Sequence, residues 1–202
     1  MLDPWARRRL DPWLDRAAAA LDGTRIGADG ITVAGFVLGI AGAVLIALGA
    51  PGWGLVPMLA GRVLDGLDGA IARRRGATDL GGYLDIVLDF IVYASLAFAF
   101  AVLDPARNAL PAAFLLLAFM GTGSSFLAFA VMAAKRRIET TARGPKSLYY
   151  LGGLTEGFET ILFFTLCCLV PVAFPALAWT FAAMCWITTA TRIAQAVATL
   201  RG

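Results

Sequence analysis

The sequence contains no histidine and only three cysteines. Without histidine, catalysis by a Ser-His-Asp triad or a Cys-His pair is excluded. Cys167, Cys168 and Cys185 fall inside hydrophobic segments and lack the spacing typical of zinc sites, so we expect them to pack in the interior. Any general base must therefore be a carboxylate or, less favourably, a lysine or tyrosine.

Charged residues are also scarce. They make up 15% of the 202 residues, against 59% hydrophobic residues, and the mean hydropathy is +0.77. This composition is too apolar for an ordinary soluble domain and indicates an integral membrane protein. The basic residues flank hydrophobic segments instead of forming one basic face, so nucleic acid is not an expected partner.

The hydrophobic segments predict an all-α membrane domain over residues 31–202. Six transmembrane helices are expected, at about residues 31–50, 55–72, 81–103, 110–134, 154–170 and 175–200. Gly35 and Gly39 have the GxxxG spacing that permits close helix packing, which we expect within this bundle.

Residues 1–30 form a separate juxtamembrane segment. They contain no continuous apolar core, so a cleaved signal peptide is not expected. Leu10, Trp13, Leu14 and Ala17 share one helical face, which predicts an amphipathic helix. Such a helix could lie at the membrane surface or pack on the cytoplasmic face of the protein itself.

The distribution of basic residues predicts the orientation. Of the 17 Lys and Arg residues, five precede the first span, three follow the second and five follow the fourth, whereas Arg107 alone lies in a loop on the other side. By the positive-inside rule, both termini should be cytoplasmic.

Four carboxylates stand at the junction of the second and third spans. Asp65 and Asp68 are three residues apart, and Asp85 and Asp89 are four apart, so each pair projects from one face of its helix. Two facing helices would bring like charges together in a poorly solvated place, which a bound cation would relieve. Oxygen ligands favour Mg²⁺, followed by Mn²⁺ or Ca²⁺. The alternative is a charged interface cluster in which the acids pair with Arg62 and Arg73–Arg75.

The spacing of these residues, D-x2-D-G-x2-A-R followed by G-x3-D-x3-D, resembles the signature of the CDP-alcohol phosphotransferases. The fixed positions are all present: Asp65, Asp68, Gly69, Ala72, Arg73, Gly81, Asp85 and Asp89. Seven residues separate Arg73 from Gly81, where the family usually has eight or more. The shorter connection should change the conformation of the loop and its contact with the nucleotide more than the positions of the metal ligands.

The resemblance implies an enzyme of phospholipid synthesis in a bacterial-type inner membrane, with its site facing the cytoplasm. It would transfer a phosphatidyl group from a CDP-linked lipid, with CDP-diacylglycerol expected, to an alcohol, and release CMP. Mg²⁺ would be the cofactor, with Mn²⁺ as a substitute, and homodimers are typical of the family.

The resemblance also implies roles for individual residues. Asp65, Asp68 and Asp85 would bind metal, and Asp89 would act as general base and as a further metal ligand. The CDP moiety would contact Thr32, Gly69, Arg73 and Gly81. Because Asp29 stands where the family commonly has an asparagine before this threonine, an equally good interpretation is that Asp29 caps the first span.

The acceptor alcohol is less clearly indicated. Arg143, Lys146, Glu156 and Glu159 gather before and at the start of the fifth span, together with Tyr149 and Tyr150. The glutamates and tyrosines suit a cationic alcohol such as choline, whereas Arg143 and Lys146 suit a phosphorylated alcohol such as glycerol phosphate or inositol phosphate. These groups could also simply pair with one another.

Two other functions use similar residues. A membrane prenyltransferase also binds Mg²⁺ and diphosphate through aspartates, but with two motifs well separated in the chain. An ion-binding transporter would show broken helices or an inverted repeat, and we find no convincing repeat here.

Overall fold

The structure is a computed structural model that describes residues 3–24, 27–136 and 153–201. Within these ranges the chain is helical and has no strand, which confirms the predicted all-α class. The elements in chain order are α1 (Asp3–Ala20), α2 (Ala28–Ala47), α3 (Pro51–Arg75), α4 (Asp79–Leu103), α5 (Pro105–Lys135), α6 (Gly157–Leu169), the short 3₁₀ helix η1 (Pro171–Ala173) and α7 (Phe174–Arg201).

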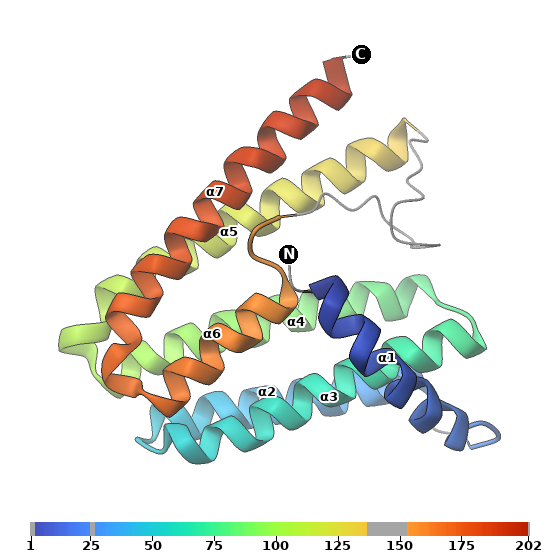
Figure 1. Cartoon of the computed structure of the whole chain (residues 1–202), viewed down its shortest axis with the longest axis horizontal. Coiled ribbons are helices and arrows are strands. Elements are labelled where there is room, and N and C mark those ends of the chain that lie inside the picture. Colours follow the sequence, from blue (N-terminus) through green and yellow to red (C-terminus); the bar gives the residue numbers. More distant parts are fainter. Residues whose placement is uncertain (1–2, 25–26, 137–152, 202) are drawn as a thin grey trace.

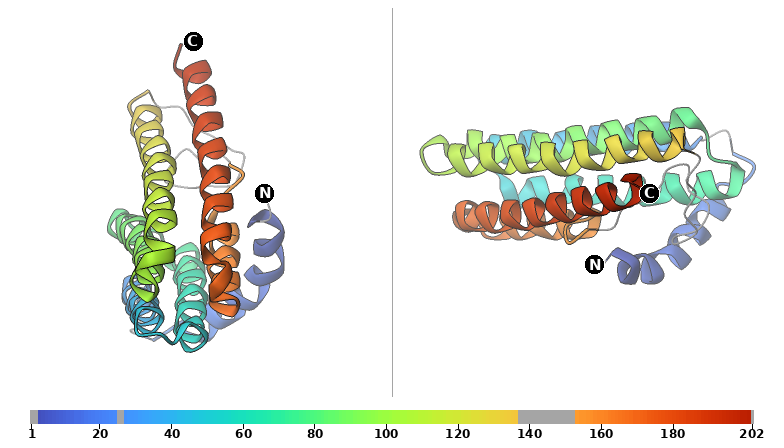
Figure 2. Two further views of the ribbon diagram at one scale, coloured as in Figure 1. Left: turned by 90° about the vertical axis from the view of Figure 1, so that its left-hand side faces the viewer. Right: turned by 90° about the horizontal axis from the view of Figure 1, so that it is seen from above.

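The helices form a bundle whose connections alternate between two ends. The turns from α2 to α3, from α4 to α5 and from α6 to α7 gather at one end (Figure 1). The α3–α4 connection, α1 and the C-terminal end of α7 lie toward the other. Helix α2 packs against α3 and α4, and α5 packs along α7 (Figure 2). Both halves of the acidic motif therefore lie at the same end of the bundle.

Four helical segments of the described chain are long and apolar enough to cross a membrane: α2, α4, α5 and the continuous stretch Pro171–Arg201. The prediction of six such spans is therefore not confirmed. Helix α3 is as long as α4, at 25 residues, but it carries the charged motif. Helix α6 has 13 residues and would be about 20 Å long, against a hydrocarbon core of about 30 Å.

Helix α1 packs on the start of the bundle. Ala18 is buried with Ile31, Ala70 and Ile71, and Leu14 lies against this cluster. A methyl group at Gly66 would lie 2.9 Å from Leu14 Cδ1, so the helix is fitted closely to the motif segment of α3. The segment thus forms a helix, as predicted, and it docks on the protein itself. Its predicted contact with the membrane surface stays a prediction.

The main core draws buried residues from α2 to α7 and is largest between α4, α5, α6 and α7. Phe100 stacks on Phe174, with ring centroids 4.6 Å apart. The three cysteines are buried in this core and are not joined in disulfides, in agreement with their expected packing role.

Glycines set the distance between α2 and α3. A methyl group at Gly42 would lie 2.8 Å from the carbonyl oxygen of Gly54, and one at Gly35 would lie 3.0 Å from the carbonyl oxygen of Gly61. Since the obstructing atoms belong to the backbone, no side-chain rotation can make room. The predicted close packing within the bundle is confirmed for Gly35, and Gly39 faces Val92 of α4.

We expect Gly42→Ala to destabilise the protein by about 1–3 kcal/mol, the usual cost of overpacking. The matched control is Gly52→Ala on α3, where a methyl group meets nothing within 4 Å and helix propensity should improve. Thermal unfolding of both variants in detergent measures the difference. Equal melting temperatures for Gly42→Ala and the unsubstituted protein would contradict this packing.

Candidate active site

The acidic motif is carried by the last turns of α3 and the first turns of α4. Helix α3 ends at Arg75, and Gly76 takes a φ of 102°, a conformation that favours glycine. Thr78 then caps α4, since its side chain accepts a hydrogen bond of 3.0 Å from the backbone N–H of Gly81. This short connection returns the chain so that both acid pairs lie at one end.

Asp65, Asp68 and Asp85 converge. One carboxylate oxygen from each lies within 4.8 Å of the other two. Asp68 is 5% exposed, and among the described residues its Oδ2 has no hydrogen-bond partner. A buried carboxylate oxygen without a donor is costly. Three hard oxygen donors with one of them unsatisfied match the requirements of a divalent cation.

Asp89 lies beside this group and forms an ion pair with Arg62. The same guanidinium is 3.8 Å from Asp65 Oδ2, donates a 3.3 Å hydrogen bond to the hydroxyl of Tyr93, and lies over the Tyr93 ring. The alternative of acid–arginine pairing is thus correct for Arg62. The predicted roles of Asp89 as base and ligand stay predictions.

The residues predicted to contact the CDP moiety line the same end of the bundle. Thr32 is buried, donates a 3.1 Å hydrogen bond to the Ala28 carbonyl and contacts the Asp68 carboxyl. A methyl group at Gly81 would lie 3.0 Å from Asp29 Oδ1, whereas one at Gly69 would make only an ordinary contact, 3.7 Å from Arg73. A side chain at Gly81 would therefore crowd Asp29, which would have to shift slightly. The nucleotide contacts of all these residues stay predictions.

The capping role considered for Asp29 is wrong. Helix α2 begins after Gly27, which is the N-cap and has no side-chain capping bond, and Asp29 is inside the first turn. A carboxylate there still interacts favourably with the positive end of the helix dipole.

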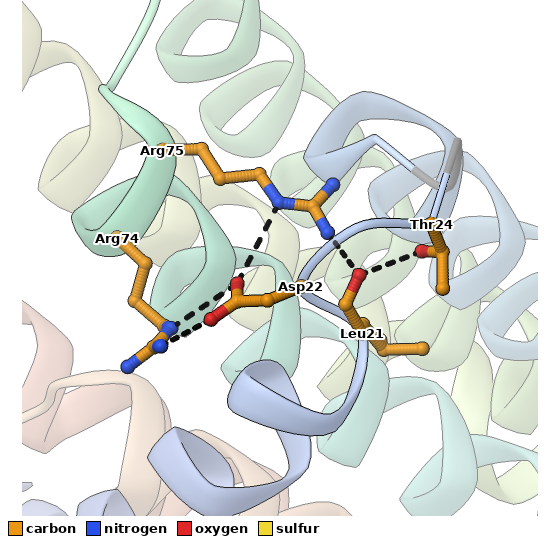
Figure 3. Close-up of polar contacts among 5 residues, drawn as sticks. All are labelled: Leu21, Asp22, Thr24, Arg74 and Arg75. Atoms are coloured by element: carbon orange, nitrogen blue, oxygen red, sulfur yellow. Dashed lines mark hydrogen bonds and ion pairs between the residues drawn. The ribbon is translucent and has the colours of Figure 1, made fainter.

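Arg73, Arg74 and Arg75 pair with acids outside the motif. Arg73 lies 3.2 Å from Asp15 and 3.8 Å from Asp11, both on α1. Figure 3 shows Arg74 paired with Asp22 and Arg75 bonded to the Leu21 carbonyl, just beyond α1. The hydrogen bond from Arg74 holds the pKa of Asp22 below its usual value. These arginines tie α1 to the end of α3, and they are exposed.

The predicted acceptor residues divide into two groups. Arg143 and Lys146 lie outside the described residues. Glu156 and Glu159 are buried and form a capping box at the start of α6: the Glu156 side chain accepts from the N–H of Glu159, and the Glu159 side chain accepts from the N–H of Glu156 at 3.2 Å. Glu156 also accepts a hydrogen bond from the N–H of Gly153 at 3.1 Å. These carboxylates thus have a structural use, and their contact with an acceptor stays a prediction.

The sequence analysis missed Arg192, a buried arginine on α7. It donates a 3.1 Å hydrogen bond to the Thr122 carbonyl and lies over the Phe126 ring. A pocket of about 160 Å³ is lined by Arg192, Glu156 and Tyr93 among others, and Tyr93 connects it to Arg62. The available signal was a charged residue within an apolar span, which marks a candidate functional position.

The profile of the CDP-alcohol phosphatidyltransferase family matches residues 25–194. The chain is 51% identical over 201 residues to the inner membrane protein YnjF of Escherichia coli, covering all of this chain and 98% of that protein. It is 40% identical over 87 residues, 43% of this chain and 41% of the relative, to the archaetidylinositol phosphate synthase of Methanothermobacter thermautotrophicus.

The fold is similar to crystal structures of the phosphatidylinositol phosphate synthase of Mycobacterium tuberculosis. The structure with bound CDP-DAG has a TM-score of 0.68 at 22% identity, covering 91% of this chain and 93% of that one. The structure in complex with manganese and citrate has a TM-score of 0.69 at 21% identity, covering 91% and 88%. Together with the four long apolar helices, the relative in E. coli supports an integral inner-membrane protein. The matches give no support to a prenyltransferase or a transporter.

Proposed function

The chain belongs to the CDP-alcohol phosphatidyltransferase family of membrane transferases in phospholipid biosynthesis, and we propose that it transfers a phosphatidyl group from CDP-diacylglycerol to an alcohol, with release of CMP. The observation that carries this proposal is the convergence of Asp65, Asp68 and Asp85, with the unsatisfied Oδ2 of the buried Asp68. The bound CDP-DAG in the mycobacterial synthase supports the choice of donor.

These three aspartates would hold a divalent cation, Mg²⁺ by preference and Mn²⁺ as a substitute. When bound, this ion would neutralise charge on the diphosphate and on the departing CMP. The manganese in the other mycobacterial structure supports a divalent ion, as does the all-carboxylate donor set.

The remaining residues would bind the donor and move a proton. Arg73 would hold the diphosphate by charge-assisted hydrogen bonds, and Thr32, Gly69 and Gly81 would border the cytidine. Asp89 would accept the proton of the acceptor hydroxyl as its oxygen bonds to the phosphorus that carries the lipid. The bond between that phosphorus and the oxygen of CMP breaks, so CMP leaves and the lipid keeps the phosphate.

We propose a phosphorylated alcohol as the acceptor, in the class of inositol phosphate. The names of the archaeal and mycobacterial relatives support this class. So does Arg192 in the pocket beside Tyr93, because a fixed guanidinium suits a phosphate. Glu156 and Glu159 would orient the hydroxyl groups, and Arg143 and Lys146 would attract the phosphate.

The remaining elements of the proposal concern the membrane. We propose that α3 and α6 lie in the bilayer with the four long apolar helices, giving six spans, and that both termini and the site face the cytoplasm. The excess of Lys and Arg at that end supports this orientation. Homodimerisation is proposed from the family alone.

The test is CMP release by purified protein in mixed micelles containing CDP-diacylglycerol and Mg²⁺. Inositol phosphate, glycerol phosphate, inositol, serine, choline and ethanolamine are supplied one at a time. We expect release that depends on a phosphorylated alcohol. Release only with choline or ethanolamine would overturn the acceptor class, and the absence of release with every alcohol would overturn the proposed reaction.

Arg73 should contribute to donor binding. We expect Arg73→Gln to raise the KM for CDP-diacylglycerol about 10- to 100-fold, since a hydrogen bond to a charged group contributes about 1.5–3 kcal/mol. Arg74→Gln is the matched control, because Arg74 is a neighbouring exposed arginine that also pairs with an acid but is not a fixed position of the motif, and its KM should stay within about twofold. Equal KM values for the two variants would remove Arg73 from the donor site.

A further inference from the structure

Thr188 of α7 joins this helix to the segment that precedes α6. Its side chain is fully buried. Its Oγ1 accepts hydrogen bonds of 3.1 Å from the backbone N–H groups of Leu154 and Thr155. A hydroxyl has two lone pairs and one proton. The two N–H groups therefore occupy the lone pairs, and the proton is left for the Met184 carbonyl, at 3.1 Å, or the Thr155 hydroxyl, at 2.9 Å.

Gly153 brings the same segment into direct contact with α7. A methyl group there would lie 2.3 Å from Thr188 Cγ2 and 3.4 Å from Nη2 of Arg192. Among the described glycines, Gly153 is not one with a positive φ, so its backbone conformation would also suit alanine. Thr188 is β-branched and its hydroxyl is held by hydrogen bonds, so its methyl group cannot easily turn away. Glycine is therefore required here by the close approach of the two segments.

The two joined segments form opposite walls of the pocket proposed for the acceptor. This pocket, of about 160 Å³, is lined from the segment and the start of α6 by Thr155, Glu156 and Gly157, and from α7 by Cys185 and Arg192. Glu156 is tied to the segment, because its Oε1 accepts the N–H of Gly153 at 3.1 Å. Thr188 lies one helical turn before Arg192 and is not a lining residue. Its effect on a bound ligand must therefore pass through the residues that it holds.

We propose that Thr188 and Gly153 are positioning residues for the acceptor: they hold the segment before α6 against α7, so that Glu156 and Arg192 have the separation that a phosphorylated alcohol requires. The inference rests on the proposed function, since that function places the acceptor in this pocket. A guanidinium that is already held in place binds a phosphate with less loss of side-chain freedom than a mobile one. The residues proposed for the donor lie on α2, α3 and the start of α4, so a change at Thr188 should weaken acceptor binding alone.

The test is Thr188→Val, which keeps the size of the side chain but removes the acceptor of two buried N–H groups. CMP release is measured with inositol phosphate or glycerol phosphate, whichever supports it, as the varied substrate. We expect the KM for this alcohol to rise about 10- to 100-fold, the effect of a small misplacement of a binding group. The KM for CDP-diacylglycerol and the specific binding of Mn²⁺ should stay within about twofold. Thr188→Ser keeps the hydroxyl and should have nearly the normal KM for the alcohol.

Thr189→Val is the matched control. Thr189 is also buried on α7, but its hydroxyl donates to the Cys185 carbonyl of its own helix, at 2.9 Å, and joins no second segment there. Its variant should bind both substrates normally.

A second pair of variants does not depend on the folding of Thr188→Val. Gly153→Ala places a methyl group against Thr188 Cγ2 and should also raise the KM for the alcohol. Adding Thr188→Ser removes Cγ2, and the nearest remaining atoms, Arg192 Nη2 at 3.4 Å and Thr188 Cβ at 3.5 Å, are at ordinary contact distances. The double variant should therefore recover most of the lost acceptor affinity.

The outcomes separate positioning from general stability. A weakened fold lowers the amount of active protein at every substrate concentration and does not raise one KM selectively. An unchanged KM for the alcohol in Thr188→Val, an equal rise in the KM for both substrates, or no recovery in the double variant would overturn the inference and leave the proposed function intact. Absence of CMP release by the unsubstituted protein with every alcohol would instead overturn the proposed function, so the two failures are distinguishable.

Discussion

Replacement of Asp68 by asparagine should abolish both specific divalent-cation binding and CMP release. Asp68 is the most deeply buried of the converging acids, and its Oδ2 has no partner among the described residues. Asparagine keeps the size but removes the negative charge. If the bound ion contributes several kcal/mol of charge stabilisation, the rate should fall by about 1,000-fold or more.

The matched control for this substitution is Asp79→Asn. Asp79 is exposed in the first turn of α4, close to the motif in sequence, and it is not a member of the converging group. Its variant should keep full Mn²⁺ binding and activity within about twofold, as is usual for surface substitutions. An Asp68→Asn protein that still turns over at a tenth of the normal rate would contradict the assigned site.

Asp89→Asn should lower kcat by about 100- to 10,000-fold, the usual contribution of general acid–base catalysis. The KM for CDP-diacylglycerol should change little, because Asp89 pairs with Arg62 and is not a member of the converging group of acids. Specific binding of Mn²⁺ should be retained. Steady-state kinetics, with cation binding measured on the same sample, separate a lost base from a lost ligand.

Asp104→Asn provides the control for this substitution. Asp104 caps α5 at the opposite end of the bundle, where its side chain accepts a hydrogen bond from the N–H of Arg107 at 3.2 Å, and asparagine is an equally good cap. This variant should match the unsubstituted protein in kcat. A loss of Mn²⁺ binding in Asp89→Asn would instead assign Asp89 to the metal.

The arrangement of the acids could be predicted from sequence because it depends on local periodicity. A spacing of three or four residues places both members of a pair on one face of a helix wherever that helix packs. The structure brings together Asp65, Asp68 and Asp85 in this way. The sequence also favoured Gly35 for close packing, and this contact is made with α3.

The partners of the arginines could not be predicted, because they depend on where distant elements dock. Arg73 pairs with acids about sixty residues earlier in the chain, and only the position of α1 makes this possible. Arg62 on α3 pairs with Asp89 on α4, and α2 packs against both of these helices. Spacing within one helix carries no information of this kind.

Two further features of the structure, the capping box of α6 and the buried Arg192, have signals in the sequence. Glu156 and Glu159 are predicted as acceptor residues, or as partners of the charged groups beside them, because they lie near hydrocarbon. Their spacing of three residues at the start of a helix also suits a capping box, which the structure contains. Arg192 is a charged residue within a long apolar segment, and such a residue is by itself a candidate functional position. In both cases the residue types are visible in the sequence, but their burial and their partners depend on the fold.

The most direct test of phosphatidyl transfer is the identity of the lipid product. Purified protein is incubated with CDP-diacylglycerol, Mg²⁺ and the alcohol selected by the CMP assay, and both products are quantified by mass spectrometry. If the alcohol attacks the phosphorus that carries the lipid, each CMP should be matched by one phosphatidyl-linked alcohol. CMP accompanied by phosphatidic acid alone would mean that water is the acceptor, and would contradict the account.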